Sequence, residues 1–535
     1  MMKRRKLELS KIKRRQFLRR LTALGGSYIL TACGDGSGSA AGVGSTSTAA
    51  VLSPEVSSAN AIVAAASASS TTIPPATSIT DITGAVWTIA HGSAYRNGAM
   101  VGVAYNVTLI LFYGNSIYCE LATNQFYNWL NSAWVACSDP RLGGTSVDGT
   151  SIPSATYIVD KNWAVWTVVG GVIYCNGATV GNTYAVSLLL WYGGMLYACA
   201  SGGNFWVYSN AKVWTSCNDP RIPLAAVAGT FYGMNGHSDY TYTPAQIVSC
   251  LKTLGCTIYR VGCTTNPVQL NATIALAKAF QVAGLTLFVL IEQGMYDVNG
   301  NLYSSESVAY AQNQASAAII ANALMQYGVT LYECGNELTR DPGIIVNTTY
   351  AGTNIVDFQN ANWPLMRGAM GGMIAGVKSV QPNAKCGINF CVADVGASDA
   401  LWDGIQPDGT TGHAKVRWDL TTWHNYQIYG DILDIGTDGS GPGFDLITYC
   451  KARYGVPFLI TEWNASPQQT EAYRATYITS EMGALYQVRK THYLQSIMYY
   501  VLDSGDNTYG IILNGVPINP PFSTFQSFVA ANSDT

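Results

Sequence analysis

Two glutamates, Glu337 and Glu462, each stand at or near the end of a short apolar run. Residues 331–338 read LYECGNEL, and residues 459–463 read LITEW. Charged residues make up only 11% of the chain, and a carboxylate inside an apolar segment is costly unless something pairs with it. Two carboxylates that face each other across a substrate supply a proton donor and an anionic nucleophile or base. The two segments therefore predict acid–base chemistry, provided that the fold brings them together.

The elements that must position these glutamates alternate between apolar runs and helical segments from about residue 226 onward. Eight runs are expected to be strands: residues 231–235, 257–261, 285–291, 329–334, 386–392, 420–424, 456–461 and 494–500. Helices are expected near residues 243–255, 268–283, 306–327, 363–380, 444–454 and 471–490, with Thr243 as an N-cap and Gly255 as a stop signal. This alternation predicts an α/β fold, a closed (β/α)8 TIM barrel over residues 226–535. A doubly wound open sheet is the alternative, although no Gly-rich phosphate loop follows an early strand.

In such a barrel the chemistry sits at the C-terminal ends of the strands. Glu337 follows the fourth expected strand, and Glu462 follows the seventh. These strands lie across the barrel mouth from one another, so the two carboxylates can face each other over a cleft. Cleavage of a glycosidic bond requires such a pair, because one carboxyl protonates the leaving oxygen and the other meets the anomeric carbon. The alternative is that each glutamate is an ion-paired structural residue.

The region from about residue 226 to 532 resembles glycoside hydrolases of clan A, the group that includes families 5 and 39. In that clan an Asn-Glu pair ends strand four and its Glu is the acid/base, which matches Asn336 and Glu337. The nucleophile of the clan is a Glu that ends strand seven, which matches Glu462. The resemblance implies a retaining enzyme, in which Asn336 donates to the sugar hydroxyl beside the reacting carbon.

Other parts of the clan's pattern are also present. An Arg on strand two usually keeps the nucleophile ionised, and Arg260 matches it; a His-x-Tyr often ends strand six, and His424 and Tyr426 match it. The resemblance implies that Arg260 and Tyr426 stabilise the Glu462 carboxylate, whereas His424 orients Glu337 or touches the substrate. Glu337 needs a setting that keeps its pKa higher, since it must start protonated.

Four further residues are expected to contact the substrate. They are His237 after strand one, Glu292 after strand three, Trp463 beside Glu462, and Tyr500 near the end of strand eight, where the clan usually has a Trp. His237 and Glu292 are equally well explained as polar loop residues, and Trp463 as a core residue. The five His are scattered without the spacing of metal ligands, so we expect no catalytic metal and no cofactor.

The N-terminal region has the features of an export signal. Residues 13–18 (KRRQFL) resemble a twin-arginine signal, and the apolar stretch that follows is shorter than the roughly 20 residues that span a bilayer. The stretch ends in LTAC, which resembles a bacterial lipobox with Cys33 as the acylated residue; an ordinary signal peptide is the alternative. We expect a signal over residues 1–33, a flexible linker over residues 34–80, and a lipid-anchored protein in the periplasm or on the cell surface.

A tandem duplication precedes the expected barrel. Within residues 81–222, the segments 85–141 and 164–221 match at a spacing of about 79 positions, with Trp87 repeated at Trp166 and Trp134 at Trp214. Short apolar runs broken by Gly and Asn-Gly predict small antiparallel β modules. Their aromatic residues either bind sugar rings or form the small cores of spacers.

Cysteine spacing is also repeated in the two segments. Cys119 and Cys137 are 18 positions apart, as are Cys199 and Cys217. Because an exported protein meets an oxidising compartment, we expect one disulfide in each copy, with buried free thiols as the alternative.

The overall composition bears on the class of function. The net charge is −3 and no Lys/Arg stripe stands beyond the N-terminus, so we expect no nucleic-acid partner. The 33 Tyr and 13 Trp together outnumber the 14 Phe, and their flat faces with polar edges suit contact with sugars. The sequence thus favours a retaining hydrolase of a β-linked polysaccharide such as cellulose, mannan or xylan. A non-catalytic sugar-binding lipoprotein on a barrel and a transglycosylase with the same residues are the alternatives.

Overall fold

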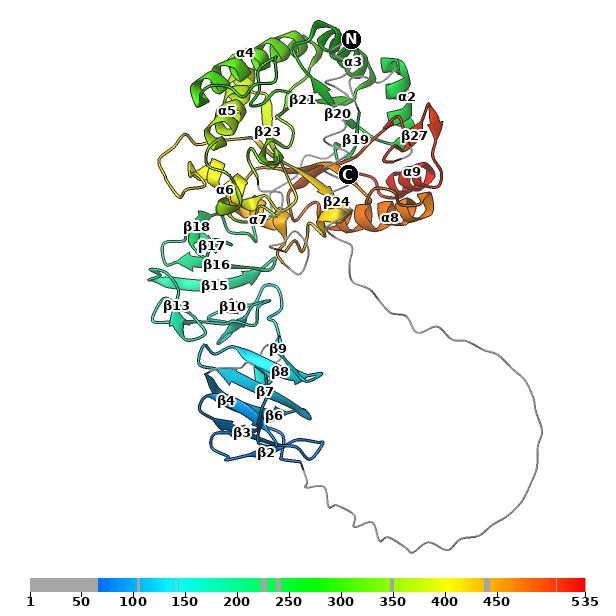
Figure 1. Ribbon diagram of the computed structural model, residues 1–535. Coiled ribbons are helices and arrows are strands. Elements are labelled where there is room, and N and C mark those ends of the chain that lie inside the picture. The colour runs from blue at the N-terminus through cyan, green and yellow to red at the C-terminus, as the bar shows by residue number, and fades with distance from the viewer. Residues whose placement is uncertain are drawn as a thin grey trace, which may run out of the picture. The chain divides into compact units, whose positions relative to one another are not determined.

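A computed structural model describes residues 66–102, 106–137, 139–142, 144–222, 229–236, 242–346, 351–436, 443–506 and 508–534 of the chain. Three of the expectations above lie outside these residues: the export signal with Cys33, residues 34–65 of the expected linker, and the candidate substrate contact His237. Within the described part, Figure 1 shows a helix-covered barrel and small β modules.

The barrel consists of eight parallel strands. They are β19 (Tyr232–Asn235), β20 (Ile258–Cys263), β21 (Thr286–Ile291), β22 (Leu331–Cys334), β23 (Lys385–Cys391), β24 (Leu420–Tyr426), β25 (Phe458–Asn464) and β26 (Leu494–Tyr499). Each strand pairs in parallel with the next, and β26 pairs with β19, so the sheet closes on itself. The predicted (β/α)8 barrel is therefore confirmed, and the open sheet is excluded.

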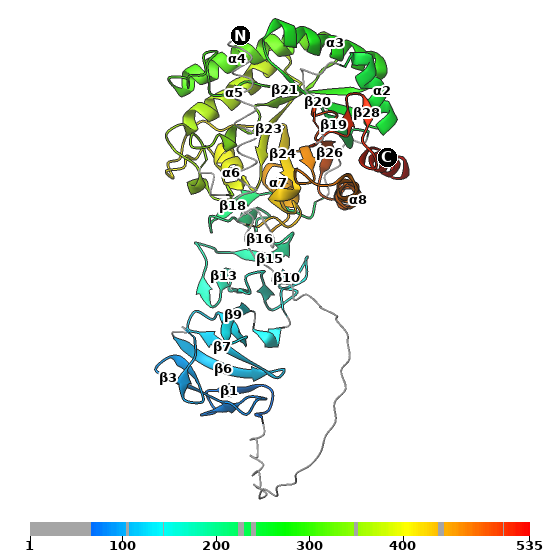
Figure 2. The ribbon, with the colours of Figure 1, turned by 45° about the vertical axis from the view of Figure 1, so that its right-hand side comes forward.

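Helices surround the barrel strands in both views of the ribbon (Figure 2). They are α2 (Pro244–Leu254), α3 (Pro267–Ala283), α4 (Glu306–Leu324), α5 (Trp363–Val380), α6 (Val395–Asp403), α7 (Leu446–Tyr454), α8 (Glu471–Val488) and α9 (Pro521–Ala531). Thr243 caps α2 through a capping box, and Gly255 ends it in the left-handed conformation, as predicted. The sequence did not predict α6 and α9, which are 9 and 11 residues long. Among the helices of the described residues, none combines the length and apolar character needed to traverse a bilayer.

Each β module is built from two antiparallel sheets. The first module contains β1 (Thr71–Ile73), β2 (Ile79–Thr80), β3 (Val86–Ala90), β4 (Ser93–Arg96), β5 (Ala99–Met100), β6 (Val107–Tyr113), β7 (Ser116–Leu121), β8 (Phe126–Leu130) and β9 (Ala133–Cys137). The second contains β10 (Ser151–Ile152), β11 (Ile158–Val159), β12 (Val165–Val169), β13 (Val172–Cys175), β14 (Ala178–Thr179), β15 (Val186–Tyr192), β16 (Met195–Ala200), β17 (Phe205–Tyr208) and β18 (Trp214–Cys217). The strand orders β1-β6-β7-β8-β9 and β2-β3-β4-β5 recur as β10-β15-β16-β17-β18 and β11-β12-β13-β14.

Both modules begin earlier than the sequence predicted. The strands β1 and β2 lie inside the expected linker, which extended to residue 80, and they pair with β6 and β3. Likewise, β10 and β11 precede residue 164, where the second copy was expected to start. Strands of two or three residues carry too little of a hydrophobic pattern to be recognised from sequence.

The expected disulfides are not formed, and the four cysteines concerned are free. Cys119 on β7 and Cys137 on β9 are separated by β8, and Cys199 on β16 and Cys217 on β18 are separated by β17. Two strand spacings amount to about 9.6 Å, which is beyond the reach of a disulfide.

The equal spacing of the cysteines has another origin. Cys119 pairs with Ile110 in the first module, and at the corresponding place in the second module Ala198 pairs with Leu189. Cys119 therefore corresponds to Ala198 rather than to Cys199. Because neighbouring strand residues point to opposite faces, Cys119 belongs to the core of the first module, whereas Cys199 faces the cluster shared with the barrel.

The second module shares a hydrophobic core with the barrel. Tyr197 and Val207 of this module are fully buried in the same cluster as the apolar residues of α7. At the edge of this contact, the backbone N–H of Asp445 donates to the carbonyl of Gly193 at 2.9 Å. The second module is therefore part of what stabilises the barrel.

We expect the two modules to differ in their contribution to stability. Deleting residues 66–142 removes only the first module and should leave the unfolding temperature of the barrel unchanged. Deleting residues 66–222 also uncovers the apolar face of α7 and should lower that temperature by at least about 5 °C, since the loss of 1 kcal/mol shifts the midpoint of a large domain by about 2–4 °C. Thermal unfolding followed by circular dichroism measures both, and equal midpoints for the two deletions would show that the second module is only a spacer.

Candidate active site

Glu337 is carried to the rim of the barrel by a sharp turn after β22. Gly335 and Glu337 both have left-handed backbone conformations, at φ 89° and 50°. A Cβ atom at Gly335 would lie 2.7 Å from the side chain of Leu338, which favours glycine there. The backbone N–H of Glu337 donates to Asn389 Oδ1 on β23 at 2.8 Å, and 23% of the Glu337 side chain is exposed. The turn thus presents a carboxyl group that is fixed at its base and accessible to a substrate.

Glu462 lies within β25 and is almost fully buried. Its Oε1 accepts from Arg260 Nη1 at 2.8 Å, and its Oε2 accepts from the hydroxyl of Tyr426 at 2.5 Å. Both donors stabilise the ionised carboxylate. Burial alone would lower the pKa of Arg260, but Glu333 and Glu462 raise that pKa well above its usual range, so the guanidinium stays charged.

Replacing Tyr426 by Phe tests the hydrogen bond to Glu462. The ring remains while the donor is lost, and a hydrogen bond to a charged group contributes about 1.5–3 kcal/mol. We expect the kcat/KM of a reaction that uses the Glu462 carboxylate to fall about 10- to 100-fold. Tyr449→Phe is the matched control, because the Tyr449 hydroxyl donates to Asp399 outside this site and its loss should leave the rate unchanged. An unchanged rate in Tyr426→Phe would contradict the expectation.

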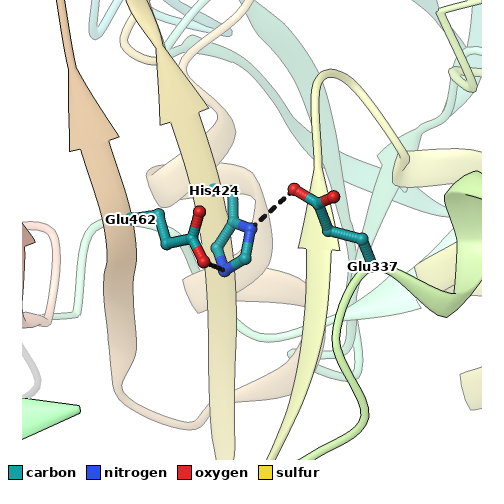
Figure 3. A group of neighbouring side chains, drawn as sticks. All are labelled: Glu337, His424 and Glu462. Carbon is teal, nitrogen blue, oxygen red and sulfur yellow. Dashed lines mark hydrogen bonds and ion pairs between the residues drawn. The ribbon is translucent and has the colours of Figure 1, made fainter. Parts of the chain in front are cut away.

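His424 lies between the two carboxylates (Figure 3). Its Nδ1 is 2.8 Å from Glu337 Oε1, its Nε2 is 3.5 Å from Glu462 Oε1, and its side chain is fully buried. One carboxylate oxygen of Glu337, one of Glu462 and a nitrogen of His424 all lie within 4.8 Å of one another. Of the two roles expected for His424, the geometry therefore favours the orientation of Glu337.

The same three side chains are the group in the described residues whose atoms are close enough to hold a metal ion. Two features disfavour a cation there. Both ring nitrogens of His424 are directed at carboxylates. The Arg260 guanidinium also lies 2.8 Å from Glu462 and would repel a second positive charge. The donor set fits a hydrogen-bonded acid–base site better than a metal centre.

A third carboxylate anchors the loop that follows Glu337. Asp394 is fully buried, accepts from the Thr339 hydroxyl at 2.6 Å, and lies 3.3 Å from Arg340 Nε. Burial, with a smaller contribution from the Glu337 carboxylate, raises the pKa of Asp394 to about 6 against the opposing effects of Arg340 and Thr339. Because the group is buried, it fixes the loop and does not reach a substrate.

Trp463 is not a substrate contact, contrary to one of the expectations from sequence. Its side chain is fully buried and packs against Tyr499 and Tyr477. Successive residues of a strand point to opposite faces, so the direction that brings Glu462 into the mouth sends Trp463 toward the helix layer. The core interpretation of Trp463 is the right one.

Tyr500 and Glu292 lie at strand ends on the same side of the barrel as the two carboxylates. The Tyr500 ring follows β26, is partly exposed, and packs edge-on against Tyr426 at 5.9 Å and Tyr509 at 5.7 Å. Glu292 follows β21, is exposed, and accepts from Gln269 of α3 at 3.1 Å. Tyr500 thus belongs to an aromatic wall beside the nucleophile candidate, whereas Glu292 contacts α3.

Four buried polar residues beneath the site were not predicted from the sequence. They are Asn235, Glu333, Asn389 and Thr461. Glu333 carried a usable signal, because a charged residue within the apolar run LYEC is almost never buried without a partner. Asn235, Asn389 and Thr461 gave no such signal, since amide and hydroxyl side chains are common at strand ends.

No family model and no curated protein matches the chain. Several solved structures are similar to part of the chain. The exo-β-1,4-mannosidase of Opitutaceae bacterium strain TAV5 is 14% identical with a TM-score of 0.41, and the match covers 59% of this chain and 62% of the mannosidase. The β-glycosidase of Thermosphaera aggregans is 11% identical with a TM-score of 0.44, covering 58% of this chain and 98% of that one. The β-glucosidase of Thermotoga maritima is 11% identical with a TM-score of 0.40, covering 58% and 100%. The barrel itself is established by its own strand pairing.

Proposed function

We propose that the chain is a retaining glycoside hydrolase that acts on a β-linked polysaccharide. The observation that carries this proposal is the pair of carboxylates at the barrel mouth, Glu337 and Glu462, with oxygens within 4.8 Å of each other. Retaining enzymes hold their two carboxyl groups about 5–5.5 Å apart, whereas inverting enzymes need about 6.5–9.5 Å to admit a water molecule. The short separation therefore supports a double displacement.

The reaction has two steps. In the first, a carboxylate oxygen of Glu462 attacks the anomeric carbon while Glu337 gives its proton to the leaving oxygen, which forms a glycosyl ester and frees the leaving sugar. In the second, Glu337 is a carboxylate and takes a proton from water as the water oxygen attacks the same carbon. The ester bond breaks, the sugar leaves with retained configuration, and both glutamates return to their starting states.

The surrounding residues support these roles. Arg260 and Tyr426 hold Glu462 as an anion until it attacks. Asn336 accepts from Arg260 Nη2 at 2.8 Å through its Oδ1, so its amide NH2 is the group that donates to the sugar 2-hydroxyl. His424 fixes the Glu337 carboxyl at 2.8 Å and thereby sets the direction of proton transfer.

The substrate class and the location of the protein rest on the sequence. The clan A motif residues favour a β-linkage, and the abundance of Tyr and Trp together with the added β modules favours an extended polysaccharide. We include in the proposal export by the twin-arginine route and a lipid anchor at Cys33, which would tether the enzyme to a membrane. No cofactor is required by the two-step chemistry.

The proposal is tested with a panel of β-glucans, β-mannans and xylans together with 4-nitrophenyl β-glycosides. The configuration of the first product is read by proton NMR within the first minutes of reaction. We expect turnover of at least one substrate with a β-configured first product. An α-configured product would contradict retention, and no turnover of any substrate would favour a non-catalytic sugar-binding protein. Products longer than the substrate would identify a transglycosylase.

A further inference from the structure

Glu333 is a fully buried carboxylate on β22, four residues before Glu337. The two-step chemistry assigns it no role. An ionised carboxylate taken out of water is costly unless its neighbours compensate it. Its position in the barrel interior therefore needs a physical explanation, which its contacts supply.

One oxygen of Glu333 is devoted to Arg260. Its Oε2 accepts from Arg260 Nε at 2.6 Å and lies 2.5 Å from Nη2, so two guanidinium nitrogens share one carboxylate oxygen in a buried ion pair. The remaining guanidinium donors reach Glu462 at 2.8 Å, Asn336 at 2.8 Å and Asn235 at 3.0 Å. Every guanidinium nitrogen of Arg260 thus contacts a hydrogen-bond acceptor, and these contacts fix the orientation of the group.

The other oxygen of Glu333 connects to both catalytic candidates through their strands. Its Oε1 accepts from the Thr461 hydroxyl at 2.8 Å, and Thr461 immediately precedes Glu462. It also accepts from Asn389 Nδ2 at 3.5 Å, while Asn389 Oδ1 holds the backbone N–H of Glu337 at 2.8 Å. Glu333 therefore links the supports of both glutamates.

The charges give this link a function. Arg260 carries one positive charge and lies between two carboxylates, Glu333 and Glu462. If Glu462 were its sole partner, the nucleophile would be neutralised in a tight ion pair, and an unopposed positive charge would remain when the glycosyl ester forms. With Glu333 present, Arg260 is already neutralised and Glu462 keeps a net negative charge toward the positively charged transition state.

We propose that Glu333 is a positioning residue that neutralises and fixes Arg260, so that Glu462 faces the substrate as a net anion and Glu337 stays protonated beside it. This inference rests on the proposed hydrolase function. It predicts that the charge of Glu333, and not only its shape, sets the pH range in which the enzyme works.

Several other titratable or charged groups surround Glu337. They are His424 on β24, Glu462 on β25, Arg260 on β20, Cys391 on β23, Asp394 and Arg340 in the neighbouring loops, and Tyr429 in the one-turn helix Gln427–Tyr429. The Glu333 variants below keep all of these side chains, so a displaced pH profile reports the charge at position 333 and its effect on Arg260.

The test is the pH profile of kcat/KM for Glu333→Gln, measured with the best 4-nitrophenyl glycoside. The amide keeps the volume of the side chain but leaves Glu462 alone to balance the charge of Arg260, so the site gains one net positive charge. The profile of a two-carboxyl enzyme is bell-shaped, with one limb for the base and one for the acid. An added positive charge lowers the pKa of nearby carboxyl groups, so both limbs of the pH profile should move to lower pH by about one unit. The value of kcat/KM at the wild-type optimum should fall about 10- to 100-fold.

Two further variants separate charge from structure. Glu333→Asp keeps the charge, so its limbs should stay at the wild-type pH although its rate falls. Asp399→Asn removes a carboxylate that pairs with Arg453 at 3.1 Å between α6 and α7, and it should leave both the limbs and the rate unchanged. If Glu333→Gln does not fold, a shift of the limbs in Glu333→Asp would by itself overturn the proposal.

The outcomes distinguish this inference from the proposed function. Unmoved limbs in a folded Glu333→Gln enzyme, while substitution of Glu462 abolishes activity, would overturn the role of Glu333 alone. Activity that survives substitution of both Glu337 and Glu462 would instead overturn the hydrolase proposal. A pH profile of kcat/KM that is displaced in Glu333→Gln, while the profiles of Glu333→Asp and Asp399→Asn keep the wild-type limbs, would support the inference.

Discussion

Replacement of Glu462 by Gln is expected to reduce glycoside hydrolysis at least about a thousandfold. The amide has nearly the same shape as the carboxylate, but it carries no negative charge to attack the anomeric carbon and cannot form the glycosyl ester. It also removes the charge that Arg260 contacts at 2.8 Å. Initial rates on the best polysaccharide and on a 4-nitrophenyl glycoside measure the loss, and far-UV circular dichroism reports whether the barrel is intact.

Glu306→Gln is the matched control for this variant. Glu306 is also a glutamate paired with an arginine, Arg367 Nη2 at 2.6 Å, but it stands at the start of α4 outside the site. We expect this control to retain the wild-type rate. If Glu462→Gln keeps a rate within about tenfold of wild type, Glu462 is not the nucleophile and the double displacement fails.

Replacement of Glu337 by Gln is expected to have an effect that depends on the leaving group. On polysaccharide the loss should reach at least about a thousandfold, because the sugar oxygen cannot leave without a proton. On a 4-nitrophenyl glycoside the first step should be much less affected, because nitrophenolate leaves as an anion. The second step still lacks its base, so a rapid burst of nitrophenol should be followed by slow turnover.

Stopped-flow absorbance measures the burst, and azide gives a second readout. In Glu337→Ala the truncated side chain leaves space for a small anion, which attacks the glycosyl ester without a base and should restore turnover as a glycosyl azide of retained configuration. An equal loss on every substrate, with no burst and no rescue by azide, would place Glu337 outside the acid/base role.

The main features of the barrel followed from local patterns in the sequence. Apolar runs and helix stop signals such as Gly255 gave the order of strands and helices, because strand and helix periodicities differ and glycine readily ends a helix. In a parallel barrel all strand C-termini meet at one rim. Placing Glu337 after strand four and Glu462 after strand seven was therefore sufficient to predict that the two side chains face each other.

Other expectations failed where the answer depended on which residues became neighbours. Trp463 was expected at the substrate, but the alternation of β25 directs it into the core against Tyr499. The cysteine spacing suggested bridges, yet an intervening strand keeps Cys119 from Cys137. In both cases the positions in the sequence were compatible with the expected contact. The arrangement of the strands, and the face of the strand to which each side chain points, excluded it.

The sequence by itself determined the fold class and the residues that meet at the barrel mouth, because strand order and strand ends are encoded locally. Only the tertiary structure decided how these residues are supported. Glu333 forms an ion pair with Arg260 and accepts hydrogen bonds from Asn389 and Thr461. These partners are 73, 56 and 128 positions away from it in the chain. Such contacts are set by side-chain direction and strand register inside a closed sheet, and no local pattern of residues specifies them.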